Sequence, residues 1–155
     1  MLRIAEHFHD SDLGRQRQGN EDNYYVRAPL FVVADGMGGA QAGEVASEMA
    51  VRSFEGGLPD GDPRERLVET IEAANARIHE RSRADRQRAG MGTTLTAAYV
   101  AEDAVVVAHV GDSRCYLLRC GCASACSSVS LPRATSSPTS EWSRVRRTRS
   151  PPRSR

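Results

Sequence analysis

The 155-residue chain carries 21 basic and 20 acidic side chains, and its net charge of +1 indicates neither a strongly basic nucleic-acid-binding protein nor a strongly acidic one. No apolar run approaches the ~18 residues that cross a bilayer, and the first residues lack the apolar core of a signal peptide. We therefore expect a cytoplasmic protein with no membrane partner and no nucleic-acid partner.

The first half of the chain predicts strands followed by a helix. Short strands are expected at residues 3–8 and 24–27, and the apolar residues 30–34 predict a buried strand. Apolar side chains in residues 42–54 recur at spacings of three and four, which predicts a helix that ends at Gly56.

A second helix and three further strands are expected next. Asp62 is a suitable N-cap before a proline, and the helix it opens should run to about residue 88. Residues 94–100 and 104–110 predict a β-hairpin, and residues 115–119 begin another strand. This order predicts an α+β fold with helices covering one face of an antiparallel sheet.

The composition changes after residue 119. Residues 1–119 carry 14 arginines against 19 acids, whereas residues 120–155 carry ten serines and seven arginines against a single acid. The second segment has no apolar periodicity, so we expect a disordered tail rich in Ser, Arg and Pro. Two interpretations remain open, a basic arm and codons read out of frame. The second is favoured because the change falls inside a strand.

Acidic residues lie at or near the ends of the predicted strands. Asp35 follows the buried strand directly and precedes three glycines within four residues, while Glu21, Asp22 and Asp112 lie next to other strands. Carboxylates are the ligands that Mg²⁺ and Mn²⁺ prefer, and one bridging carboxylate holds two such ions around a water aimed at phosphorus. Arg17 offers a guanidinium that binds phosphate through two hydrogen bonds.

Four motifs together resemble a known family. Residues 11–22, 35–47, 90–97 and 109–119 are similar, in order and spacing, to the first half of bacterial metal-dependent serine/threonine phosphatases of the PP2C (PPM) family. The resemblance implies a sandwich of two antiparallel sheets with helices outside each, of which this chain would form a partial αββα sandwich, incomplete at its C-terminus. The expected organisation is a PP2C-like part over residues 1–119 and the tail over residues 120–155.

The resemblance also implies a metal site that holds two Mn²⁺ or Mg²⁺ ions. Asp35 would bridge the two metals, and Glu21 and the carbonyl of Gly36 would bind one of them, directly or through water. Asp22 would orient a metal-bound water, and Asp112 would serve an accessory third metal.

The substrate side of the site follows from the same resemblance. Arg17 would hold the phosphate of a phosphoserine or phosphothreonine in a protein substrate, such as a kinase or a signalling regulator, and Thr94 would lie close to the metal cluster. Met37 stands where eukaryotic relatives have a histidine, so a histidine acid is missing at that position.

One departure from the family bears on activity. The later aspartates of the family have no counterpart here, because no aspartate follows Asp112. The sequence therefore predicts a phosphatase by ancestry that is inactive or nearly so as written. The alternatives left open are a non-catalytic remnant that binds a partner protein or phosphopeptide, and a metal-binding module without chemistry.

Overall fold

The computed structural model describes residues 1–15, 19–38, 42–119 and 122–125. Strands come first, then two helices, then strands again. The elements are β1 (Asp22–Arg27), β2 (Leu30–Met37), α1 (Ala42–Arg52), α2 (Pro63–Ala84), the 3₁₀ turn η1 (Arg86–Arg88), β3 (Gly92–Thr93), β4 (Leu95–Val100), β5 (Val105–Val110), β6 (Tyr116–Arg119) and β7 (Cys122–Ala125).

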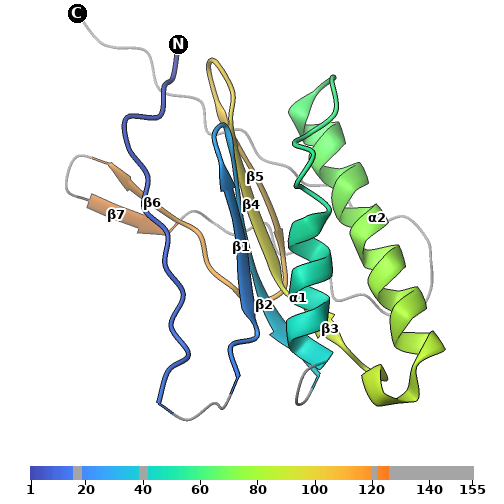
Figure 1. Cartoon of the computed structure of the whole chain (residues 1–155). Helices are drawn as coiled ribbons and strands as arrows, with labels where there is room; N and C mark the ends of the chain where they lie inside the picture. The colour runs from blue at the N-terminus through green and yellow to red at the C-terminus, as the bar shows by residue number, and fades with distance from the viewer. Residues whose placement is uncertain (16–18, 39–41, 120–121, 126–155) are drawn as a thin grey trace, which may run out of the picture.

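A five-stranded antiparallel sheet forms the centre of the molecule. Its strands lie in the order β1-β2-β4-β5, and the short β3 pairs with the last residues of β2 (Figure 1). Because neighbouring strands run in opposite directions, the start of β1, the end of β2, the start of β4 and the end of β5 meet at one end of the sheet. We call this the acidic end, since it carries Asp22, Asp35 and Asp112.

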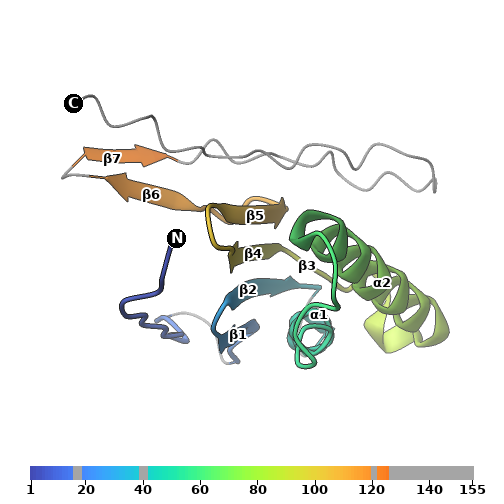
Figure 2. The same cartoon turned by 90° about the horizontal axis from the view of Figure 1, so that it is seen from above.

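Helices α1 and α2 cover one face of the sheet (Figure 2). The α1 helix buries small side chains such as Ala46 and Ala50, which allows it to lie close to β2. The α2 helix is capped by Asp62, whose carboxylate accepts a hydrogen bond from the Arg64 N–H at 3.0 Å. Its apolar stripe packs against the sheet and consists of Leu67, Ile71, Ala74 and Ile78.

The other face of the sheet is less well covered. Along β2, Leu30, Val32 and Ala34 are buried towards the helices, whereas the intervening Val33 is 50% exposed. On β1, Tyr24 is 41% exposed on the same face as Val33, because the two residues are register partners. The helix-covered face therefore holds the main hydrophobic core.

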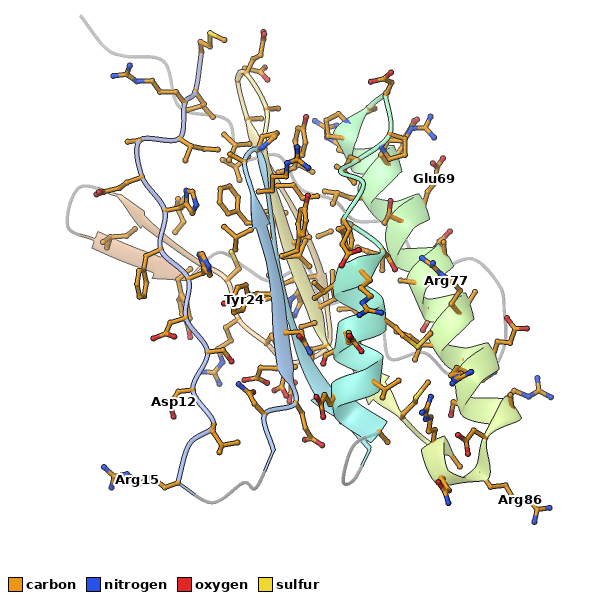
Figure 3. The ribbon with its side chains drawn as sticks, in the orientation of Figure 1. Asp12, Arg15, Tyr24, Glu69, Arg77 and Arg86 are labelled. Atoms are coloured by element: carbon orange, nitrogen blue, oxygen red, sulfur yellow. The ribbon has the colours of Figure 1, made fainter. Side chains whose placement is uncertain are left out.

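The N-terminal segment lies over this second face, on the side away from the helices (Figure 2). The His7 ring lies 5.4 Å from that of Phe31, and the His9 ring lies 4.7 Å from that of Tyr24, which Figure 3 shows on the side of β1 towards this segment. The predicted strand at residues 3–8 is wrong, since these residues have no regular structure. The segment contacts the face of the sheet through its side chains and does not extend a backbone ladder.

The structure confirms the α+β class, the antiparallel sheet and the placement of both helices on one of its faces. The buried strand differs from the prediction: β2 runs on to Met37, because β3 pairs with Gly36 and Met37. Asp35 thus lies inside the strand and not after it. Within the described residues, no helix has the length and apolarity that crossing a membrane requires.

The region after residue 119 is described only in part. Cys122–Ala125 forms β7 and pairs with β6, so these four residues differ from the irregular tail expected there. The remainder of residues 120–155 lies outside the described residues, so the boundary at 119 and the incompleteness of the sandwich stay predictions.

Candidate metal centre

Two carboxylates are cross-strand neighbours at the acidic end. Asp22 in β1 and Asp35 in β2 are register partners. Such partners project from the same face of a sheet, with their Cβ atoms about 4.5–5.5 Å apart. Both residues are exposed on the face opposite the helices. Two neighbouring carboxylates offer oxygen donors of the kind that a hard divalent cation prefers.

A contact between two glycines fixes the neighbouring backbone. A Cβ at Gly36 would lie 2.1 Å from the carbonyl oxygen of Gly43 in α1, so the end of β2 touches the start of the helix. A Cβ at Gly43 would lie 2.9 Å from Glu21 Oε1, which places the Glu21 carboxylate at the same contact. Only glycine fits at either position without a shift of backbone atoms.

Hydrogen bonds to its carbonyl oxygen hold the Glu21 backbone at this contact. Its carbonyl oxygen accepts from the Gly36 N–H at 3.1 Å and from the Ser47 hydroxyl at 2.6 Å. Ser47 is fully buried in α1, and its hydroxyl oxygen accepts from Asn23 Nδ2 at 2.9 Å. The roles of Asn23 and Ser47 are not predicted by any of the sequence motifs. A serine among the small residues of an apolar helix face was the available signal.

The backbone of Asp35 is held on both sides. The Thr94 N–H donates to the Asp35 carbonyl oxygen at 2.8 Å, and the Asp35 N–H donates to Thr94 Oγ1 at 3.1 Å. The Thr93 hydroxyl donates to the same carbonyl oxygen at 3.0 Å. Because Thr94 is buried, these bonds fix the strand beneath an exposed carboxylate.

Thr94 also connects Asp35 to the turn that carries Asp112. Thr94 Oγ1 lies 2.7 Å from Ser113 Oγ, within hydrogen-bond distance. Gly111 has a positive φ of 101°, and a Cβ there would lie 2.7 Å from Thr94 Cγ2. Thr94 therefore contacts the backbone of Asp35 and the side chain of Ser113, while its proximity to a metal cluster stays a prediction.

Arg114 follows this turn and is fully exposed. Its guanidinium donates to the Tyr116 hydroxyl at 3.4 Å, and this hydrogen bond, with the charges of Tyr116 and Asp112, raises the pKa of Arg114. An arginine is protonated at any working pH, so this shift does not alter the charge that Arg114 carries beside the turn.

The structure describes all of the predicted site residues except Arg17. Arg17 lies outside the described residues, so its role stays a prediction, and Arg15 points outward from the N-terminal segment (Figure 3). Met37 is 53% exposed at the end of β2. Asp22 and Asp35 are neighbours across β1 and β2, and Glu21 and Gly36 lie at the contact with Gly43. Asp112 lies in a turn whose flanking residues contact Thr94, and its role as a ligand stays a prediction.

The possible ligand atoms at the acidic end determine which metal could bind there. All of them are oxygens, which suits Mg²⁺ or Mn²⁺. Within residues 1–15, 19–38, 42–119 and 122–125, however, no three His, Cys, Asp or Glu side chains lie close enough together to hold a metal ion. The described residues thus fit one part of a divalent-metal site, a carboxylate pair, and do not form a closed set of ligands.

Comparison with known proteins gives the following similarities. A family model described as Protein phosphatase 2C matches residues 15–137. The serine/threonine phosphatase stp of Listeria monocytogenes is 45% identical over 121 residues, which cover 70% of this chain and 48% of that protein. The serine/threonine protein phosphatase PstP of Mycobacterium tuberculosis is 42% identical over 114 residues, which cover 72% of this chain and 22% of that protein. The chain therefore spans about half the length of its Listeria relative, and less of PstP.

Solved structures agree with this result. The catalytic domain of PstP in complex with two manganese ions aligns with a TM-score of 0.70 at 40% identity, over 76% of this chain and 52% of that domain. The serine/threonine phosphatase Stp1 of Staphylococcus aureus aligns with a TM-score of 0.67 at 32% identity, over 74% of this chain and 49% of its own. Sequence and fold thus agree over the same part of the chain.

Proposed function

The chain belongs to the protein phosphatase 2C family, and from this premise we propose that it is the N-terminal part of a metal-dependent phosphoserine/phosphothreonine protein phosphatase. The observation that carries the proposal is the Asp22–Asp35 pair, set side by side on an exposed face and supported by the backbone contacts of Asp35. The two manganese ions of the PstP complex support the choice of metal.

In this proposal, each residue at the acidic end has a distinct role. Asp35, Asp22 and Glu21 would hold Mn²⁺ or Mg²⁺ ions through their oxygens, directly or through water, with Asp35 as the central ligand, and Asp112 would serve an accessory ion. When bound, the ions lower the pKa of water and stabilise charge on the phosphoryl group. The Gly36–Gly43 contact brings the Gly36 carbonyl group and the Glu21 carboxylate to the same side-chain position of α1, since both would lie 2.9 Å from a Cβ at Gly43.

Two further positions concern the substrate. Arg17 holds the phosphate of a phosphoprotein in this proposal, because a guanidinium pairs with two phosphate oxygens at once. Met37 has no proton to give, so the acid that protonates the leaving group is not the side chain at this position.

The 155-residue chain by itself is proposed to have little or no turnover. No aspartate follows Asp112 in the sequence. The chain therefore has no further aspartate that could complete the set of metal ligands. The alternative is a non-catalytic remnant that binds a partner protein or phosphopeptide through Arg17. The two functions differ in their dependence on metal.

Equilibrium Mn²⁺ binding, measured by electron paramagnetic resonance, tests the proposal. We expect the chain to bind Mn²⁺ and Asp35→Asn to lose most of this affinity. Asp103→Asn is the matched control, because Asp103 is an exposed aspartate in the β4–β5 turn at the opposite end of the same sheet. Equal Mn²⁺ affinity in all three proteins would reject the metal centre.

Phosphopeptide assays separate the enzyme from the remnant. With Mn²⁺ present, we expect phosphate release from a phosphothreonine peptide at or near background. Turnover that disappears in Asp35→Asn would show that the 155-residue chain is active and contradict its proposed inactivity. Metal-independent peptide binding that is lost in Arg17→Ala and unchanged in Asp35→Asn would favour the remnant.

A further inference from the structure

A buried histidine at the end of β5 has both ring nitrogens hydrogen-bonded. His109 is 4% exposed; its Nδ1 lies 2.8 Å from Thr96 Oγ1, and its Nε2 lies 3.0 Å from the Gly111 carbonyl oxygen. A carbonyl oxygen can only accept, so Nε2 carries the hydrogen in this bond. In the neutral ring Nδ1 then accepts from the Thr96 hydroxyl, so the two partners together determine one tautomer.

The hydrogen bond from His109 reaches the turn that carries Asp112. Gly111 is held on one side by His109 Nε2 and packs on the other against Thr94, where a Cβ would lie 2.7 Å from Thr94 Cγ2. Ser113, on the far side of Asp112, lies 2.7 Å from the Thr94 hydroxyl. The exposed Asp112 therefore stands between two anchored residues.

We propose that His109 is a positioning residue that fixes the backbone of residues 111–113 and thereby aims the Asp112 carboxylate at the metal centre. This deepens the proposed function and rests on it, because Asp112 is one of its metal ligands. The polar pair with Thr96 sits on a face of β4 and β5 whose other members include Ala98 and Val107. An apolar pair would pack there, but it would leave the Gly111 carbonyl without its partner.

Two amide substitutions separate the hydrogen bonds of the two ring nitrogens. In His109→Gln the side-chain amide reaches about as far as Nε2 and can donate to the Gly111 carbonyl. In His109→Asn the shorter amide reaches about as far as Nδ1 and can pair only with Thr96. Both variants remove the ring, so the loss of packing is similar in each.

The first measurement needs no metal. Backbone ¹⁵N relaxation of residues 111–113 should give order parameters of about 0.85 in the wild type and in His109→Gln, and values below about 0.6 in His109→Asn. Imidazole ¹⁵N shifts of the wild type should show the hydrogen on Nε2. A rigid turn in His109→Asn, or an equally mobile turn in both variants, would overturn the positioning role.

The second measurement asks whether the effect passes through Asp112. We expect His109→Asn to weaken Mn²⁺ binding about tenfold, as loss of a residue that orients a ligand commonly does, and His109→Gln to restore it. In an Asp112→Asn background, His109→Asn should cause no further loss of Mn²⁺ affinity. An equal loss in both backgrounds would contradict the route through Asp112.

Two outcomes keep the inference separate from the proposed function. If the wild type binds no Mn²⁺, the proposed function fails, while the relaxation data still decide whether His109 fixes the turn. If both His109 variants unfold, Thr96→Val tests the positioning role with the ring in place, because it replaces the hydroxyl that orients Nδ1 by a methyl group and so loosens the ring that holds the Gly111 carbonyl. We expect intermediate order parameters in residues 111–113, and an unchanged turn would overturn the inference.

Discussion

The two faces of the sheet differ in how their side chains are covered. Val32, Phe54 and Leu67 in the core under the helices are at most 1% exposed, whereas Val33 and Tyr24 on the opposite face are 50% and 41% exposed. The carboxylates of Asp22 and Asp35 project from the second face. Stability and chemistry are thus assigned to different faces, and substitutions on each should have different effects.

The largest effect is expected in the core under the helices. Phe54 follows α1 and is 0% exposed, so Phe54→Ala should lower the free energy of unfolding by about 3–5 kcal/mol through lost burial and a new cavity. Urea denaturation followed by circular dichroism measures this change. A loss below about 1 kcal/mol would mean that this face is not the main core.

The glycine contact between β2 and α1 should be the next most sensitive site. A Cβ at position 36 would lie 2.1 Å from a backbone oxygen, so Gly36→Ala should cost about 1–3 kcal/mol as the helix is pushed from the strand. Gly56→Ala is the matched control, because nothing lies within 4 Å of a Cβ there. Equal melting temperatures for the two variants would refute the close contact.

Ser47 tests the buried polar link between α1 and β1. Ser47→Ala removes the hydroxyl that donates to the Glu21 carbonyl and accepts from Asn23, and should cost about 1–3 kcal/mol. Ser53→Ala provides a partly exposed control on the segment that follows α1, with an expected cost of about 0.5 kcal/mol. A smaller loss at Ser47 than at Ser53 would be inconsistent with the link.

The smallest effect is expected on the opposite face. Val33→Thr keeps the side-chain shape and the preference for a strand, and Val33 is already half exposed, so the unfolding free energy should change by less than about 0.5 kcal/mol. The same substitution at buried Val32 should cost clearly more, because it buries a hydroxyl group. Equal costs at positions 32 and 33 would remove the contrast between the two faces.

Local sequence signals predicted much of this architecture. The spacing of Leu67, Ile71 and Ile78 identified the buried stripe of α2, and the apolar residues around Val32 identified the central strand. Both signals arise within one element, where periodicity determines which side chains face the core. The position of the acids next to the predicted strands is likewise visible in the sequence itself.

The contacts that organise the acidic end could not be read from local sequence. Thr94 holds the backbone of Asp35 across a separation of 59 residues. The continuation of β2 through Asp35 to Met37 likewise depends on pairing, of Asp35 with β1 and of the last two residues with β3, and the Gly36–Gly43 contact depends on how α1 lies against the strand. These features follow from tertiary packing, which a single sequence does not display.

Paramagnetic broadening by Mn²⁺ tests the central claim, a divalent-metal site at the acidic end, most directly. In a ¹H–¹⁵N spectrum of the chain titrated with Mn²⁺, amide signals at Asp22 and Asp35 should broaden first, and those of the β4–β5 turn at residues 101–104 should persist. In Asp35→Asn, the amide signals at positions 22 and 35 should no longer broaden before those of the β4–β5 turn. Broadening that begins instead around the exposed Asp60, or that is uniform over the chain, would contradict a metal centre at this end of the sheet.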